Sequence, residues 1–440
     1  MTDKFQTPQT LRKFTIIWLG QTLSIIGSGM TQFALSIWVW KLTGHVTDLA
    51  LFGFFSQLPQ IFISLVSGVI VDRANRKFLM VLGDTVTGCL TIMLLILYAT
   101  NDLQLWHLYL AIAIAGIFEQ LQTLAFGASI ATLVPKEHYG RASSMGFIAS
   151  YGSDIIGPAL ASILFITIGL GGIMAIDIFT FVIAVTTVLF VKIPQPKSTK
   201  SETISRKNLS NISQEITFGF RYLLQHSSLF IMLIWVSLFW FVHDIGDSLY
   251  SAMILTRTNN DPRILGSLAS AAGIGGIASA LLLTKWGGFQ RRIKGIQLGM
   301  LGAGLSKIFF GLGKTPLVWL PTQLCSSFNF PLLGSSFDAI WLSKVEPELQ
   351  GRVFATRSLF IMLVSALGYL FAGPLADYIF EPAMMPDGIL APALGWLLGT
   401  EKGSGIVLLY LLCSLSMLII GLSGQALSSL KDLDLEKNED

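Results

Sequence analysis

The chain alternates between long apolar runs and short polar connections. The runs are continuous over about 20 residues, whereas a half-buried strand would alternate apolar and polar positions. Lipid offers no hydrogen-bond partner to an exposed backbone group, so segments of this kind cross a membrane as helices. The pattern predicts twelve membrane-spanning helices, over residues 14–40, 47–71, 78–100, 104–133, 142–167, 171–191, 221–256, 264–284, 293–313, 316–343, 353–380 and 403–429.

Composition supports the same class of protein. Hydrophobic residues make up 52% of the 440 positions and charged residues 12%, and the mean hydropathy is +0.67. A chain this apolar exceeds what one soluble core can bury, so we predict an all-α polytopic membrane protein. The first apolar run is too long for a cleaved signal peptide and is interpreted as the first span.

One long polar connection divides the spans into six and six. Residues 193–218 contain two prolines and many Ser, Thr, Lys and Asn residues. Gly140-Arg141 opens the fifth span and Gly351-Arg352 opens the eleventh, an offset of 211 residues that indicates a parallel internal repeat. We therefore predict two pseudo-symmetric halves, residues 1–192 and 219–430, joined by a cytoplasmic linker, 193–218, and followed by a cytoplasmic tail, 431–440.

The distribution of basic residues predicts the orientation. If both termini are cytoplasmic, 21 of the 29 Lys and Arg residues lie on the inner side and five on the outer side. This bias predicts a multi-pass protein of the cell (inner) membrane. The net charge of +3 is then a topology signal, so no nucleic-acid partner is expected.

Signatures of soluble enzymes are absent from the sequence. The segment Gly311–Thr315 partly matches the sequence of a phosphate-binding loop. That motif requires a glycine at position 308, where this chain has Ile308. The three cysteines, Cys89, Cys325 and Cys413, lie far apart within spans and have no metal-site spacing. We expect no enzymatic activity, no cofactor and no metal site.

The connection between the second and third spans carries the most specific motif. Residues 68–77 read GVIVDRANRK, a G-x-x-x-D-R-x-x-R-K pattern that resembles the loop between spans 2 and 3 of the major facilitator superfamily. Further segments resemble the macrolide-efflux and siderophore-exporter branch of that superfamily: Ser24–Met30, Leu58–Arg73, Leu133–Pro135, Gly157-Pro158 and Phe218–Tyr222. The resemblance implies the major facilitator fold, a rocker-switch transporter whose spans 1, 4, 7 and 10 line a central cavity, and antiport of protons against an exported compound.

The resemblance and the internal repeat together suggest a gate at the inner side. Asp72 ends the second span where the repeat places the start of the eleventh, and a carboxylate at a helix N-terminus is stabilised by roughly 0.3–1 kcal/mol. The basic side chains of the hairpin either take part in gating or anchor the topology, and both roles can hold together. The gating set is Gly68, Asp72, Arg73, Arg76, Lys77, Gly351 and Arg352.

Two proline-containing motifs occur within spans. Gly157-Pro158 in the fifth span resembles the core of a signature associated with exporters, and its proline removes a hydrogen bond and bends the helix. A bend needed only for packing is the alternative. The segment Gly373–Asp377 also begins with a Gly-Pro pair, but it lies near the outer end of the eleventh span. We interpret it as structural.

Ionisable groups within spans are costly and mark functional sites. The repeat offset brings the polar residues around Glu119, in the middle of the fourth span, to positions 330–334, next to Asn329, and it maps Gln32 to His243. The candidates for proton coupling and the cavity are Glu119, Gln122, Gln32, His243, Asp244, Asp247 and Asn329. Hydrogen bonding between helices without substrate is the alternative for each. Many members of the superfamily carry an arginine in span 4, whereas here that span holds Glu119.

Other ionisable groups receive structural or gating interpretations. Asp84 and Asp177 are interpreted as structural. Asp338 and Arg357 lie near the inner ends of the tenth and eleventh spans, where an ion pair between them would form an inner latch. The loop 382–400 is long and apolar and is expected at the outer leaflet.

These observations predict a secondary active transporter. The expected activity is proton-coupled export of an amphipathic small molecule, such as a macrolide-like drug or a secondary metabolite. The expected partners are the substrate, protons and membrane lipid, with the protein acting as a monomer. Import of a polar solute is one alternative, which a cavity dominated by a single fixed charge would support. A non-transporting lipid scramblase or membrane scaffold is another.

Overall fold

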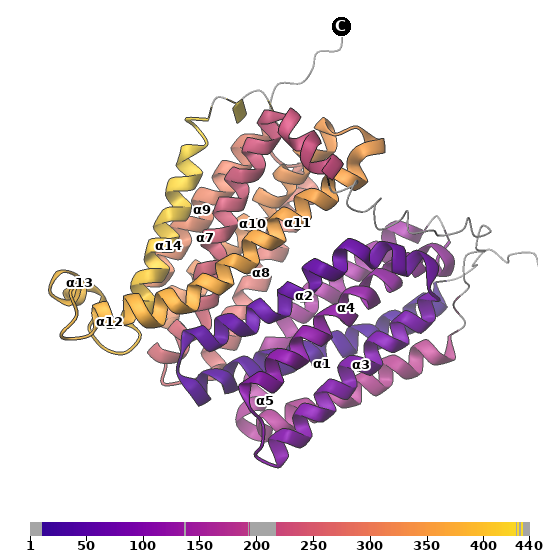
Figure 1. Cartoon of the computed structure of the whole chain (residues 1–440), viewed down its shortest axis with the longest axis horizontal. Helices are drawn as coiled ribbons and strands as arrows, with labels where there is room; N and C mark the ends of the chain where they lie inside the picture. The colour runs from indigo at the N-terminus through magenta and orange to yellow at the C-terminus, as the bar shows by residue number, and fades with distance from the viewer. Residues whose placement is uncertain are drawn as a thin grey trace, which may run out of the picture. The chain divides into compact units, whose positions relative to one another are not determined.

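A computed structural model describes residues 11–135, 138–191, 193, 217–427, 429–430 and 433 of the chain. Its labelled helices (Figure 1) are α1 (Arg12–Thr43), α2 (Val46–Arg73), α3 (Arg76–Ala99), α4 (Leu105–Leu133), α5 (Tyr139–Phe190), α7 (Ser227–Arg257), α8 (Pro262–Trp286), α9 (Arg292–Leu312), α10 (Pro316–Lys344), α11 (Pro347–Pro374), the π-helix η2 (Leu375–Phe380), α12 (Glu381–Met384), α13 (Ala391–Leu398) and α14 (Ser404–Ser423). Residues 217–225 are also helical. The predicted all-α membrane fold is confirmed.

Ten helical segments of the described chain are long and apolar enough to cross a membrane. Two features account for the difference from the predicted twelve. Helix α5 covers both the fifth and the sixth predicted span, with a break at Gly169, whose φ of 65° is a left-handed conformation that suits glycine. Helix α10 covers the tenth predicted span, but its internal Pro321 and Pro331 and its polar side chains lower its hydropathy.

Packing divides the chain into two compact units. The first contains residues 1–39 and 55–205, and the second contains residues 40–54 and 206–440. The end of α1 and the beginning of α2 therefore belong with the second unit, which the sequence did not predict. The predicted linker lies almost entirely outside the described residues, so its extent stays a prediction.

The first unit is held together by small residues at helix contacts. Helix α1 packs on the second half of α5 at Gly20 and Gly27, where a Cβ atom would overlap the hydroxyls of Thr187 and Thr180. Helix α3 packs against both α4 and α5. An apolar core at one end of the unit includes Phe14, Ile17, Leu79, Met80, Ala125 and Val188.

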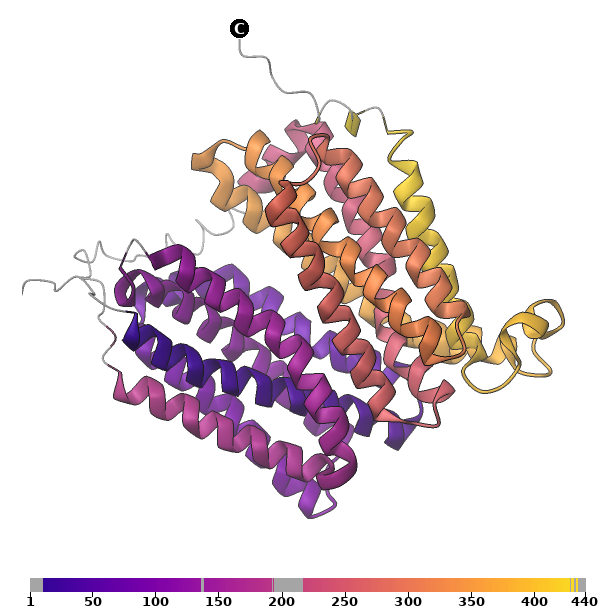
Figure 2. The ribbon, with the colours of Figure 1, turned by 180° about the vertical axis from the view of Figure 1, so that it is seen from behind.

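The second unit has a larger aromatic core. Helix α10 packs against α8 and α9, α14 against α7 and α9, and α11 against α7 (Figures 1 and 2). The indole of Trp235 is buried and donates a hydrogen bond to the carbonyl oxygen of Ile420 over 2.7 Å. The buried core includes Trp235, Phe239, Phe337, Trp341, Met417 and Ile420.

The long loop after η2 is partly helical. Helices α12 and α13 form within it, and Met384 and Leu398 are buried. Ile389 and Trp396 are 89% and 79% exposed, so an apolar surface remains on this segment. Placement of the loop in the outer leaflet stays a prediction.

Candidate functional site

The first unit contains a buried amide and carboxylate cluster that joins three helices. Asp84 of α3 is 2% exposed and accepts hydrogen bonds from the amides of Gln21 (α1), over 2.8 Å, and Gln122 (α4). The Gln122 amide also contacts Gln21 Oε1 at 2.6 Å. Gln122, predicted for the cavity, thus contributes to a hydrogen-bonded contact between helices, because a buried carboxylate in an apolar surrounding requires donors.

Asp177 is tied to the protein in the same way. It lies in the second half of α5, is 4% exposed and accepts hydrogen bonds from Ser28 (3.1 Å) and Thr91 (3.2 Å). Because these donors come from α1 and α3, the carboxylate joins three helical segments. The structural interpretation of Asp84 and Asp177 agrees with these contacts.

Glu119 of α4 has a different surrounding. It is partly buried, and within the described residues its carboxylate has neither a hydrogen-bond donor nor an ion-pair partner. The charge of Asp177 is close enough to act on it electrostatically. Gln32 is exposed on α1 and likewise forms no polar side-chain contact to a described residue. Glu119 is thus a mid-helix carboxylate that no donor among the described residues holds in place.

In the second unit, His243 and Asp244 form a contact that is surrounded by aromatic rings. His243 Nδ1 lies 2.9 Å from Asp244 Oδ1, and both side chains are 11% exposed. The imidazole is edge-on to Trp240 of α7 and to Phe330 of α10, at ring-centre distances of 5.0 and 4.9 Å. Acid, base and aromatic surface are therefore gathered at one place.

A buried lysine complements these acids. Lys307 of α9 is 5% exposed, and the negative charges of Asp247 and Asp244 act on its ammonium group. Its Nζ atom lies 5.7 Å from the ring centre of Tyr410, a cation–π distance. The sequence showed Lys307 as a charge within an apolar span, which is the signal that identifies it, but no role was predicted for it.

Two further cavity candidates have different contacts. Asp247 is exposed and lies 3.4 Å from the Tyr369 hydroxyl, which donates to it. The Asn329 amide donates to the Cys325 carbonyl oxygen of its own helix over 2.7 Å and packs on α9 at Gly302, where a Cβ atom would overlap it. Asn329 thus has a local role that the repeat offset could not show.

The basic residues of the hairpin bind helix ends. Arg76 donates to the carbonyl oxygen of Ala128 near the end of α4 over 2.7 Å. Lys77 donates to the carbonyl oxygens of Leu189 (2.7 Å) and Val191 (2.9 Å) at the end of α5. Cations at helix C-termini satisfy free carbonyl groups and interact favourably with the helix dipole. The structure describes neither the surroundings of Gly68 nor the side chains of Asp72 and Arg73. The contact of Asp72 with span 11 therefore stays a prediction.

The start of α11 packs against residues 217–225. The guanidinium of Arg352 lies 5.5 Å from the ring centre of Phe218, and a Cβ atom at Gly219 would overlap the Thr356 hydroxyl. A Cβ atom at Gly351 would meet open space. This packing involves the second and third turns of α11, while the gating role of Gly351 and Arg352 stays a prediction.

The fifth-span motif lies at a close helix crossing. A Cβ atom at Gly157 would approach the Gly29 backbone of α1 to 3.3 Å, and Ser153 donates to the Ile25 carbonyl oxygen over 3.0 Å. Pro158 follows within the helix. The contact with α1 supports a packing role for Gly157, beside the bend that the proline favours.

Asp338 and Arg357 form an ion pair, while their role as an inner latch stays a prediction. Arg357 Nη1 is 2.8 Å from Asp338 Oδ1, and the side chains are 16% and 57% exposed, respectively. The guanidinium also lies over three rings, those of Phe337 (5.1 Å), Trp341 (5.5 Å) and Phe354 (5.1 Å). The sequence did not predict these aromatic contacts.

We expect Arg357→Gln to lower stability more than Asp338→Asn does. An ion pair with an exposed partner contributes about 0–1 kcal/mol, whereas each desolvated cation–π contact contributes about 0.5–2 kcal/mol. Thermal unfolding of both purified variants in detergent measures the difference. An equal loss in the two variants would show that the ion pair dominates.

No group of three or more His, Cys, Asp or Glu side chains in the described parts of the chain could hold a metal ion. The cysteines are unpaired: Cys89, Cys325 and Cys413 are free.

Comparison with known proteins identifies the type of fold. A family model described as Major Facilitator Superfamily matches residues 17–369. Macrolide efflux protein A of Streptococcus pyogenes is 27% identical over 369 residues, which cover 83% of this chain and 90% of that protein. The multidrug efflux pump Tap of Mycolicibacterium fortuitum is 20% identical over 448 residues, 99% of each chain. A solved bacterial homolog of the human lysosomal transporter Spinster, in an inward-facing conformation, has a TM-score of 0.71 at 14% identity and covers 97% of this chain and 100% of its own.

Proposed function

Because this chain belongs to the major facilitator superfamily, we propose that it exports an amphipathic small molecule, such as a macrolide, by antiport against protons. The protein is a multi-pass membrane transporter and not an enzyme. The relatives named macrolide and multidrug efflux proteins support the direction of transport and the substrate class. The proposed mechanism is rocker-switch alternating access of a monomer in the inner membrane, with both termini cytoplasmic.

The observation that carries the proposal is the pair of ionisable sites within the membrane helices. Glu119 in the first unit has no fixed cation among the described residues, and His243 with Asp244 in the second unit lies among aromatic rings. Ionisable groups at such depth mark proton relays and substrate paths, because their burial has to be offset by function. Each unit would thus supply one site that can exchange a proton.

The alternatives fit these sites less well. A transporter for a polar solute would need a site dominated by one fixed charge, whereas acid, imidazole and aromatic rings occur together near Trp240 and Phe330. Aromatic surface and a nearby acid suit an amphipathic compound that carries a basic group. A scaffold or scramblase would not require a mid-helix acid such as Glu119, which has no polar partner among the described residues.

Expression in a susceptible bacterial host tests the proposal. Cells that carry the intact chain should accumulate less of a radiolabelled macrolide than cells that carry an empty vector. A proton uncoupler should restore accumulation to the level of the vector control. Equal accumulation with and without the chain would contradict macrolide export, and export that persists in the presence of the uncoupler would contradict proton coupling.

A further inference from the structure

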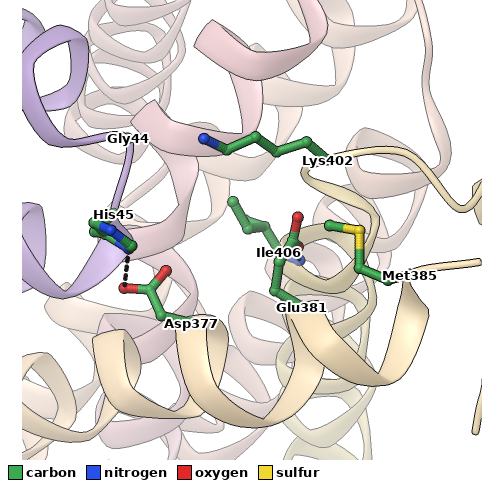
Figure 3. Close-up of a pocket in the computed structure, with 7 residues that line it drawn as sticks. All are labelled: Gly44, His45, Asp377, Glu381, Met385, Lys402 and Ile406. Atoms are coloured by element: carbon green, nitrogen blue, oxygen red, sulfur yellow. Dashed lines mark hydrogen bonds and ion pairs between the residues drawn. The ribbon is translucent and has the colours of Figure 1, made fainter. Parts of the chain in front are cut away.

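Asp377 of η2 and Glu381, the first residue of α12, each bind the beginning of another helix through a carboxylate. Figure 3 shows both side chains at the pocket that they line. Asp377 accepts from the backbone N–H of Val46 through Oδ1 (3.0 Å) and from the backbone N–H of Thr47 through Oδ2 (2.7 Å). The Thr47 hydroxyl donates to the same Oδ2 over 2.6 Å. The first N–H groups of a helix lack partners within the helix, so Asp377 caps the N-terminus of α2.

A glycine one turn earlier allows this approach. A Cβ atom at Gly373 of α11 would overlap the Cα atom of Thr47. Gly373 and Asp377 thus contact the same turn of α2, one through close backbone packing and the other through charge-assisted hydrogen bonds. Their G-x-x-x-D spacing matches that of Gly68 and Asp72 in the hairpin at the opposite end of α2.

Glu381 provides a chemically similar contact with a different partner. Its carboxylate accepts from the backbone N–H groups of Gly403, Gly405 (3.0 Å) and Ile406 (3.3 Å), and so caps α14. Helix α14 lies wholly within the second compact unit. The segment 40–54 that Asp377 binds is also grouped with this unit, but the chain on both sides of it, up to residue 39 and from residue 55, belongs to the first unit.

We propose that Asp377 and Gly373 form a clasp that holds the α1–α2 connection against α11 in one state of the transport cycle and releases it in another. The inference rests on the proposed alternating access. On the predicted topology the clasp lies at the outer side, where it would oppose opening of the outer entrance.

The surroundings of the clasp suit a contact that opens. A pocket of about 190 Å³ adjoins it, lined by Gly44, His45, Asp377, Glu381, Met385, Lys402 and Ile406. His45 is 66% exposed at the side chain, and its Nδ1 lies 3.9 Å from Asp377 Oδ2. Polar groups beside an open pocket can exchange backbone donors for water, so release leaves the carboxylate and the helix end solvated.

Val46 provides a reporter for release because its side chain is 0% exposed. The reporter Val46→Cys is introduced with Cys89, Cys325 and Cys413 changed to serine, and the purified protein is labelled in nanodiscs with a hydrophilic maleimide. Asp377→Asn should raise the labelling rate about threefold to tenfold, because an amide is uncharged and places donors opposite the N–H groups. Glu381→Gln, a matched acid-to-amide change four residues away, should leave the rate within about twofold.

A second variant and a reference labelling site distinguish release of the clasp from general unfolding. Thr47→Val keeps the side-chain shape and removes only the hydroxyl donor, so it should raise the rate less than Asp377→Asn does. His45→Cys, at an exposed position, gives the rate of an open site. The clasp is overturned if Asp377→Asn and Thr47→Val both label at the parent rate, or if the parent Val46→Cys already labels as fast as His45→Cys.

Labelling in the presence of a macrolide separates the clasp from the proposed substrate. A change of the parent rate on adding a macrolide supports opening during the cycle. If the macrolide has no effect on the parent rate while Asp377→Asn and Thr47→Val both label faster, the clasp is supported. That result contradicts only the macrolide as the substrate. If Glu381→Gln raises the rate as much as Asp377→Asn does, the contact is a general packing feature and the clasp is rejected.

Discussion

Glu119→Gln is expected to abolish export driven by a pH gradient while substrate binding and exchange persist. Glutamine keeps the size and polarity of the side chain but cannot take up and release a proton. Because Glu119 has no donor or cation partner among the described residues, the change removes no contact on which the fold depends. The variant should therefore lose uphill transport completely without losing folded protein.

Reconstituted vesicles with an imposed pH gradient measure this effect. Asp84→Asn is a matched control, since it is another buried acid of the same unit but is bound by Gln21 and Gln122. It should change stability more than coupling, because an amide retains only part of the acceptor capacity. Full uphill transport by Glu119→Gln would exclude Glu119, and the same assay on His243→Ala and Asp244→Asn would then decide whether the second unit couples the proton.

Gly275→Ala is expected to reduce the yield and thermal stability of the folded protein strongly. A Cβ atom at this position would overlap the carbonyl oxygen of Leu324, so α8 and α10 would have to move apart. Overpacking typically costs about 1–3 kcal/mol, and it costs more where backbone rather than a side-chain tip must shift.

The neighbouring glycine is the control. A Cβ atom at Gly276 would meet no atom within 4 Å, and alanine is favoured over glycine in a helix by about 1 kcal/mol. Gly276→Ala should thus be neutral or slightly stabilising. Size-exclusion profiles and thermal unfolding of the two variants in detergent make the comparison. Equal behaviour of the two variants would show that the close contact at Gly275 is not required.

The fold was predictable because the membrane restricts the possible structures severely. Continuous apolar runs allow only helices, so the all-α class followed from the pattern alone. The break in α5 at Gly169 is a single glycine with no polar connection, and the sequence still separated the two spans there because their combined length exceeds one bilayer crossing. The grouping of residues 40–54 with the second unit depends on contacts between distant parts of the chain, which no local pattern records.

The candidate sites were predictable in part. The cost of burying charge identified Glu119, His243 and Asp244 as residues that need explanation. Their partners were not predictable, because the contact of Gln122 with Asp84 depends on the rotation of three helices about their axes. Similarly, the sequence could not distinguish the roles of Gly275 and Gly276. Only the packing shows that Gly275 faces the backbone of Leu324.

Asp377 shows where the interpretation of a motif was incomplete. The sequence placed Gly373–Asp377 near the end of a span and assigned it a structural role. The observed cap on α2 agrees with that role. The shared spacing with Gly68 and Asp72 was the available signal for a more specific contact, but two residues at a fixed distance do not reveal which helix end they meet.

The π-helix has a consequence for how the sequence can change in length. In η2 each turn holds more residues than an α-helical turn, so the directions of Asp377 and Glu381 depend on the π-helical winding. Deleting one residue between them would restore α-helical winding and rotate one carboxylate away from its helix end. Homologous chains that retain Asp377 and Glu381 should therefore also retain the length of this segment. Chains in which the segment is shorter should lack both acids. Alignment gaps within residues 375–380 would then identify transporters that hold the start of the second helix by other means.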